Sequence, residues 1–291
     1  MNLPAFGTPS LCDRLATNAS RSAHRYNATH MNFEFHALTD PGLVRDNNED
    51  SVALDPDNRL SILADGMGGY NAGEVASAMA TTFIKTELGR WIAEGGFEAS
   101  ARELKRAMEI CIDNANRSIF NAANANPQYA GMGTTLVMGV FLDGRVMIGH
   151  VGDSRCYRLR RGEFVQMTRD HSLLQEQIDA GLISMEQAQF ATHRNLVTRA
   201  LGVEDTVLLE VNEYRVEDGD LYLFCSDGLN DMLSDERIAA LLVTAGTLEE
   251  KATALVEAAN GAGGRDNISV ILAFARARAT RRGLLSRMLG Q

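Results

Sequence analysis

The chain lacks the features that mark several classes of protein. It has only four cysteines in 291 residues, with no C-x-x-C pair and no metal-ligand spacing, so nothing indicates a zinc ribbon or an oxidising compartment. Cys111, Cys156 and Cys225 lie in apolar periodic segments, where we expect buried free thiols. No apolar run approaches the roughly 20 residues of a spanning helix, and the start of the chain does not resemble a secretory signal. We therefore expect no membrane span and a cytoplasmic location.

Basic charge is also scarce. The 28 Lys and Arg residues are outnumbered by 38 Asp and Glu residues, which leaves a net charge of -10. A surface that neutralises nucleic-acid phosphates needs the opposite balance, so nucleic acid is not an expected partner. The hydrophobic content of 45% is enough for one large domain or two small ones with a sizeable core.

The chain divides into three regions. Residues 1–30 are rich in Asn, Ser, Thr, Ala and Arg without periodicity, which predicts a flexible N-terminal extension. Alternation begins at Met31, and the main domain is expected over residues 31–276. A polar, helix-forming stretch between strands predicts an inserted flap at about 172–195. Residues 277–291 form a basic C-terminal tail, for which a solvated tail is favoured over a membrane-surface or partner-docking element.

The main domain alternates between groups of strands and pairs of helices. Apolar strand-like runs are expected at 31–40, 51–54, 60–64, 134–142, 146–151, 156–159, 221–225 and 268–274. Short polar links at 143–145 and 160–163 are typical of antiparallel hairpins. Helical patterns cover about 72–93 and 97–123, and later 235–243 and 248–260. This order favours packed antiparallel sheets with helical layers outside, and disfavours a doubly wound parallel sheet.

Carboxylates recur where the buried strands emerge. A single aspartate at a strand end is usually a turn former or a helix cap, but here there are five, all but the first of them next to Gly or Asn: Asp50, Asp65, Asp153, Asp227 and Asp266. If these strand ends converge, mutual repulsion would raise the pKa values of the carboxyl groups unless cations were bound between them. Carboxylate oxygens without His or Cys suit Mg²⁺ or Mn²⁺ far better than Zn²⁺.

Two neighbouring features fit a phosphate substrate. Gly66 follows Asp65 directly, which allows the backbone to approach a metal and to offer its carbonyl; the alternative is a loop that needs positive φ angles. Arg45 precedes the acidic "NNED" run, and a guanidinium holds two phosphate oxygens in a fixed fork that lysine does not match.

At these residues the sequence resembles the metal-dependent PP2C-type (PPM) serine/threonine protein phosphatases, particularly the compact bacterial members. The resemblance runs from about residue 33 to 274. It rests on an ordered set of motifs: "GLVRDNNEDS", "ADGMGGYNAGEVAS", "GMGTTLV", "HVGDSRCYRLRRGEF", "DHSLL", "LVTRALG", "CSDGL" and "GGRDNISVIL". It implies an α+β fold, a four-layer α/β/β/α sandwich with two central antiparallel sheets flanked by helix pairs.

The resemblance also implies roles in binding Mn²⁺ or Mg²⁺. Asp65 would bridge two metals, and Gly66 would offer its carbonyl to one of them. Asp227 and Asp266 would bind the other metal. Met67 stands where animal members carry a histidine proposed as general acid, so protonation of the leaving group would come from another source.

Four further roles follow from the same resemblance. Glu49 and Asp50 would hold the cluster directly or through metal-bound water, and Arg45 would grip the substrate phosphate. Asp153, with Asp227, would form a third and weaker metal site. The catalytic set is then Arg45, Asp65 and Asp227.

The expected activity is hydrolysis of phosphoserine and phosphothreonine in proteins by a water activated by two metals, which reverses serine/threonine kinase signalling. Expected partners are phosphorylated proteins, among them a cognate kinase and its substrates. The chain is expected to act as a monomer, because no coiled coil is evident. Three alternatives stay open: a catalytically inactive phosphoprotein-binding relative, a small phosphate-ester hydrolase, and a phosphatase tuned to one regulator.

Overall fold

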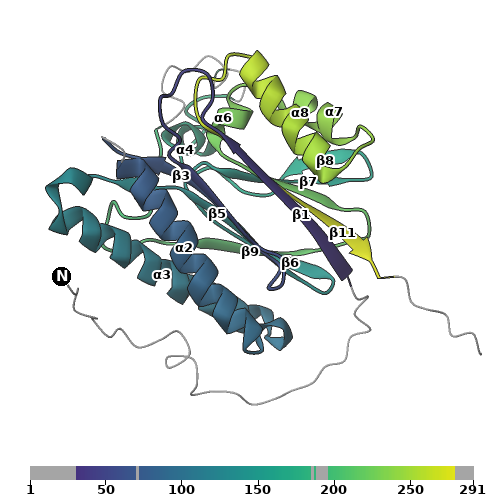
Figure 1. The fold of residues 1–291 in the computed structure, drawn as a ribbon, viewed down its shortest axis with the longest axis horizontal. Helices are drawn as coiled ribbons and strands as arrows, with labels where there is room; N and C mark the ends of the chain where they lie inside the picture. The colour runs from purple at the N-terminus through teal and green to yellow at the C-terminus, as the bar shows by residue number, and fades with distance from the viewer. Residues whose placement is uncertain (1–30, 70–71, 185–186, 188–195, 279–291) are drawn as a thin grey trace, which may run out of the picture.

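Two antiparallel sheets face each other, and helices cover the outer face of each (Figure 1). The computed structural model describes residues 31–69, 72–184, 187 and 196–278. The expected four-layer sandwich of α+β type is confirmed. The N-terminal extension and nearly all of the basic tail lie outside the described residues, as do residues 185–186 and 188–195 of the predicted flap.

The first sheet joins both ends of the described chain. Its strand order is β1 (Met31–Asp40), β11 (Ile268–Ala277), β10 (Leu221–Cys225), β7 (Arg155–Arg160) and β8 (Glu163–Gln166). β1 pairs with β11 over its whole length, from Met31 opposite Ala277 to Asp40 opposite Ile268. The last strand is therefore inserted between the first strand and the middle of the domain.

The second sheet is built mainly from consecutive hairpins. Its order is β2 (Asp50–Asp55), β3 (Leu60–Met67), β5 (Leu136–Leu142), β6 (Arg145–Val151) and β9 (Glu210–Arg215), with β4 (Gly133–Thr134) beside the end of β3. The predicted run 134–142 is therefore interrupted at Thr135, whose N–H donates to the carbonyl of Asp65 at 2.8 Å.

Two helix pairs form the outer layers. α2 (Ala72–Ala93) and α3 (Ala101–Ala125) cover the second sheet, whereas α7 (Asp235–Leu242) and α8 (Leu248–Gly261) cover the first (Figure 1). The predicted start of the second helix at 97 is wrong, because a capping box between Ser100 and Glu103 begins α3 at residue 101. The residues before it form the short helix η1 (Gly96–Glu98).

Three apolar cores separate the four layers. One lies between each helix pair and its sheet, and the third fills the space between the sheets. Phe141 lies in this third core, with its ring centroid 5.0 Å from Phe33 and 5.4 Å from Tyr222. Burial of these rings on both inner faces fixes the two sheets against each other.

The cysteine and membrane expectations can also be compared with the structure. Cys111, Cys156 and Cys225 are buried free thiols, as expected, and burial raises the pKa of Cys111 and of Cys225 to about 12. Among the described residues, no helix combines the length and the apolar character that a membrane crossing requires.

The connections place five chain segments at one end of the sandwich. β2 begins there, β3 ends there, β6 crosses to β7 there, β10 ends there and β11 begins there. Three short helices are also present. α6 (Asp227–Asn230) begins directly after β10, η2 (Pro127–Tyr129) precedes β4, and α4 (Leu173–Asp179) follows β8. The aspartates of the strand ends are therefore gathered by the topology.

Candidate metal centre

Asp50 and Asp65 lie directly opposite each other in the β2–β3 ladder. The Ser226 hydroxyl donates to Asp50 Oδ2 at 2.8 Å. Burial raises the pKa of Asp50 to about 7, and burial together with the charges of the surrounding aspartates raises the pKa of Asp65 well above its usual range. Ionising the Asp50 and Asp65 carboxyl groups together therefore destabilises the folded protein unless a positive charge lies beside them.

Asp227 and Asp266 approach the same place from the first sheet. Asp227 follows β10 as the first residue of α6, and Asp266 lies two residues before β11. Burial and then the charge of Asp153 raise the pKa of Asp227 well above its usual range, with further contributions from Asp266 and Asp50. All four of these aspartates therefore act on one another electrostatically.

Asp153 lies on the crossover between β6 and β7. Burial raises its pKa to about 6, and the charges of Asp170 and Asp231 act in the same direction. Asp231 also raises the pKa of Asp227, which stands one helical turn before it. Asp231 was not among the predicted site residues, although its spacing from Asp227 is visible in "CSDGLND".

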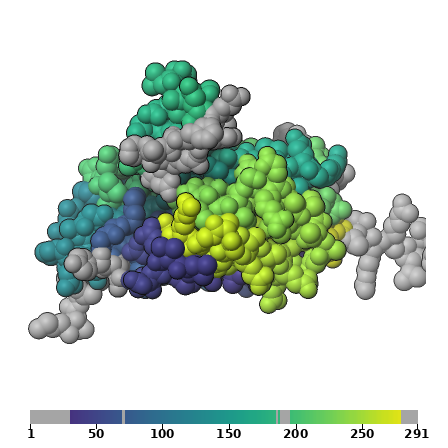
Figure 2. Space-filling view, turned by 90° about the horizontal axis from the view of Figure 1, so that it is seen from above, coloured from purple at the N-terminus to yellow at the C-terminus, as the bar shows by residue number. Residues whose placement is uncertain are grey.

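Arg45 lies beside the carboxylates. Its Nη2 donates to Asp266 Oδ2 at 2.7 Å, and about half of its side chain is exposed (52%). The bond to Asp266 raises the pKa of Arg45 further. Burial raises the pKa of Glu49, the charge of Arg45 lowers it and the charge of Asp266 raises it. The loop that holds Arg45 lies beside the start of β11, because Leu43 N–H donates to the carbonyl of Gly264 at 2.7 Å; Figure 2 shows these first and last described parts of the chain, purple and yellow, in contact.

One amide side chain orders this loop. Asn267 Oδ1 accepts from the N–H of Glu49 at 2.8 Å, and Asn267 Nδ2 donates to the carbonyls of Pro41 and Asn47 at 3.0 and 2.8 Å. Asn267 is 5% exposed. Asn267 was not predicted to have this role from the "RDNISV" motif, since its contact to Glu49 joins positions more than 200 residues apart.

Gly66 is required by close packing of backbone. A Cβ at this position would lie 2.2 Å from the carbonyl oxygen of Gly73 and 2.5 Å from that of Glu49. Gly66 is part of β3 and does not have a positive φ. The alternative explanation, a loop that needs left-handed backbone, is therefore wrong at Gly66; its role as a carbonyl ligand stays a prediction.

The residues present fit divalent cations. Buried Asp50 Oδ1 has no hydrogen-bond partner among the described residues, although a buried carboxylate oxygen is normally paired. Oxygen donors from several aspartates, with pKa values raised by mutual repulsion, are the ligand set that Mg²⁺ and Mn²⁺ prefer. The fold and this site together define a protein that binds divalent cations at one end of a β-sandwich.

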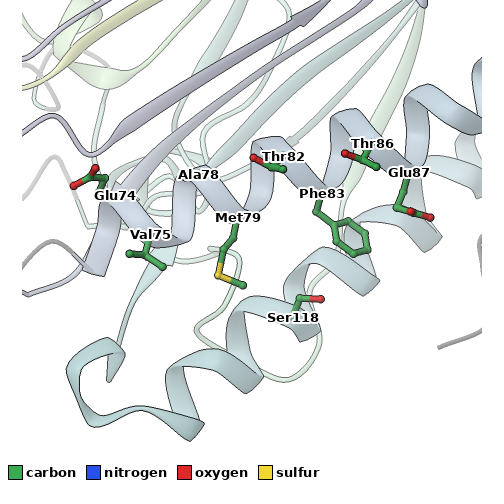
Figure 3. A pocket seen from close by; sticks show the side chains of 9 residues that line it. All are labelled: Glu74, Val75, Ala78, Met79, Thr82, Phe83, Thr86, Glu87 and Ser118. Carbon is green, nitrogen blue, oxygen red and sulfur yellow. The ribbon is translucent and has the colours of Figure 1, made fainter. Parts of the chain in front are cut away.

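An apolar pocket of about 640 Å³ lies elsewhere on the surface (Figure 3). Val75, Met79 and Phe83 of α2 line it, with Glu74 and Glu87 at its margins and Ser118 contributed by α3. None of the predicted site residues takes part in it, so we assign it no role in the chemistry.

Comparisons with known proteins agree with this picture. The family model described as Protein phosphatase 2C matches residues 44–272. The serine/threonine phosphatase stp of Listeria monocytogenes is 38% identical over 245 residues, which cover 83% of this chain and 95% of that protein. The chain therefore belongs to the protein phosphatase 2C family, and the resemblance inferred from the motifs is confirmed.

Solved structures support the same assignment. The serine/threonine phosphatase Stp1 from Staphylococcus aureus matches with a TM-score of 0.78 and 33% identity, over 88% of this chain and 99% of that one. The catalytic domain of the phosphatase PstP, solved in complex with two manganese ions, matches with a TM-score of 0.74 and 36% identity, over 85% of this chain and all of that one.

Proposed function

We propose that this chain hydrolyses phosphoserine and phosphothreonine in proteins with the help of divalent cations, and that the gathered aspartates are its catalytic centre. One observation carries the proposal. Carboxylates that lie up to 216 positions apart, from Asp50 to Asp266, meet at one end of the sandwich with raised pKa values and an arginine beside them. The named relatives, serine/threonine phosphatases at 33–38% identity, support the substrate class.

The proposed cation ligands are those that the resemblance to the family implies. Asp65 is proposed to hold two cations, one of them together with the carbonyl of Gly66 and the other together with Asp227 and Asp266. Divalent cations held there would acidify a water and offset negative charge on the transferring phosphoryl group. Glu49 and Asp50 are proposed to hold the cluster in place from the loop and strand that face Asp65.

A third cation is proposed at Asp153 and Asp227. Asp231 joins this group because its charge acts on both of them. The enzyme would then bind two Mn²⁺ or Mg²⁺ ions firmly and a third more weakly.

Arg45 is proposed to bind the substrate phosphate. The guanidinium is half-exposed and tied at one nitrogen to Asp266, which places a fixed positive charge at the edge of the cluster. Bidentate hydrogen bonds from a guanidinium would orient the phosphoryl group and stabilise the charge that builds on its oxygens.

The physiological partners remain part of the proposal. A cognate serine/threonine kinase and its substrates are proposed as the source of the phosphoproteins. The monomeric state and the cytoplasmic location stay predictions, as does the extent of the flap over about 172–195.

The test is release of phosphate from a phosphothreonine peptide, with EDTA, Mg²⁺ or Mn²⁺, by the wild type and by Asp65→Asn and Asp227→Asn. We expect turnover that depends on the added cation and is abolished in both variants, while circular dichroism shows the same fold. A small aryl phosphate assayed in parallel separates a protein phosphatase from a hydrolase of small esters. Folded wild-type protein without turnover under any metal would point to an inactive phosphoprotein-binding relative instead.

A further inference from the structure

Two histidines and a glutamate lie close together beside the metal centre. Potential ligand atoms of His150, His171 and Glu210 are all within 4.8 Å of one another. Their hydrogen bonds argue against a cation between them. The Gly152 N–H donates to His171 Nδ1 at 3.2 Å, so the ring proton lies on Nε2, which is 3.3 Å from Glu210 Oε2. A cation at Nε2 would move that proton to Nδ1, against the Gly152 N–H.

The cluster of His150, His171 and Glu210 is better explained as a support for the chain segment around Gly152, to which His171 is hydrogen-bonded. Gly152 is the first residue of the crossover from β6 in one sheet to β7 in the other. Its φ of +100° takes it out of the ladder, and a Cβ there would lie 2.8 Å from the Thr135 side chain. His171 provides hydrogen-bond partners for both backbone groups of Gly152. Its ring accepts from the Gly152 N–H, and its own N–H donates to the Gly152 carbonyl at 2.9 Å.

The His171 ring is itself held from three sides. Glu210 accepts from Nε2, and the ring stacks on His150 with centroids 4.6 Å apart and an interplanar angle of 15°. His150 and Glu210 are direct partners in the β6–β9 ladder, and His150 Nε2 lies 2.8 Å from the carbonyl of Arg169. The His171 carbonyl accepts from the Thr198 N–H at 2.8 Å. At 7% exposure His171 is buried.

These hydrogen bonds also restrict the backbone of Asp153. It follows Gly152 directly, and the next residue, Ser154, is fixed by a 2.7 Å hydrogen bond between its hydroxyl and that of Thr135. The charges of Asp170 and Asp231 oppose the ionised Asp153 carboxylate. The backbone on both sides of Asp153 is anchored, by His171 on one side and by Thr135 on the other, and this sets the direction in which the Asp153 side chain leaves the chain.

We propose that His171 is a positioning residue which, through Gly152, holds the Asp153 carboxylate where the third divalent cation binds. The inference rests on the proposed function, since it takes Asp153 as a metal ligand. It assigns Glu210 the role of fixing the His171 tautomer, in the way that outer carboxylates orient histidines in metal sites.

Three substitutions separate positioning from simple packing. His171→Asn keeps an acceptor near Nδ1 for the Gly152 N–H, whereas His171→Gln places its amide near Nε2 and leaves that N–H unpaired. His36→Gln, on β1 of the other sheet, is the matched control. Titration with Mn²⁺, followed by electron paramagnetic resonance of the free ion, counts the bound ions and gives the affinity of each class.

We expect His171→Gln to weaken the weakest class of Mn²⁺ site about tenfold and His171→Asn to rescue most of that loss, with the tight sites and the control unchanged. In an Asp153→Asn background, His171→Gln should have no further effect on Mn²⁺ binding. Equal losses at tight and weak sites, no loss in His171→Gln, or a full additional loss in the Asp153→Asn background would overturn the inference.

The same proteins distinguish this inference from the proposed function. Turnover of the phosphothreonine peptide by the wild type, together with any of those outcomes, refutes the role of His171 alone. Only two Mn²⁺ ions on an active wild type would refute the third site and the role of His171 with it. Failure of the wild type to turn over the peptide would refute the proposed function. Should His171→Gln not fold, Glu210→Gln provides a milder change, for which a smaller loss at the weakest site is expected.

Discussion

The metal-free protein should lose stability as the pH rises from 4 to 8, and Asp50→Asn should remove a defined part of that loss. Burial raises the pKa of Asp50 to about 7, from 3.8. Below pH 3.8 the carboxyl is protonated in both the folded and the unfolded chain, so it has no effect. Between 3.8 and about 7 the unfolded chain releases its proton while the folded chain keeps it, and stability falls. Above pH 7 the cost is constant.

The size of the effect follows from the shift. A rise of this extent corresponds to about 4 kcal/mol, at 1.36 kcal/mol for each pH unit. Asp50 is buried, so water screens little of it. Asn resembles the protonated carboxyl in shape and keeps an acceptor for the Ser226 hydroxyl, which is 2.8 Å from Asp50 Oδ2. The variant should therefore match the wild type near pH 4 and be more stable by a few kcal/mol at pH 8.

Urea unfolding in EDTA, followed by circular dichroism at pH values from 4 to 8, measures this difference. Asp57→Asn, in the exposed turn between β2 and β3, is the control and should follow the wild type throughout. Mn²⁺ added at pH 8 should stabilise the wild type more than Asp50→Asn, since bound cations remove the repulsion that the substitution also removes. Parallel pH profiles of the wild type and Asp50→Asn would refute the reasoning.

Three further predictions concern single residues. Gly66→Ala should destabilise the protein by about 2 kcal/mol or more, because backbone oxygens lie 2.2 and 2.5 Å from the added Cβ, whereas Gly69→Ala, with nothing within 4 Å, should be nearly neutral in urea unfolding. Arg45→Lys should raise KM for a phosphothreonine peptide about tenfold through loss of the bidentate fork; unchanged steady-state kinetics would remove Arg45 as the phosphate ligand. Arg160→Met should cost about 3 kcal/mol in thermal or urea unfolding, because it leaves fully buried Asp220 without the guanidinium that lies 2.6 Å from it.

Much of the fold was accessible from local patterns in the sequence. Alternating or continuous apolar runs predicted the strands that became β6, β7 and β10 to within one residue at each end. The runs for β3 and β11 began correctly and ended three residues early, and helical periodicity predicted α2 from 72 to 93. Two strands were missed. In β9 the adjacent polar residues Asn212 and Glu213 break the alternation, and β8 has only four residues, so neither shows a strong period.

The candidate site was accessible in part. Strand-end aspartates and the motif order identified the carboxylates, and they did converge. Three residues of the site region were not predicted, although each stands in a quoted motif or beside one: Asp231, Asn267 and His171. The spacing of Asp231 from Asp227 is a local signal, whereas the contacts of Asn267 and His171 run to chain segments distant in sequence, for which one sequence carries no signal.

What the sequence by itself determined is the chemistry available: which residues carry oxygen ligands, where most of the strands and helices lie, and the family to which the chain belongs. The tertiary structure alone decided which of these residues meet. The β2–β3 ladder sets Asp50 against Asp65, and the insertion of β11 beside β1 brings Asp266 to Arg45. Local preferences fix each strand within a few residues, whereas the pairing of strands depends on burying both inner faces at once, and this is a property of the whole chain.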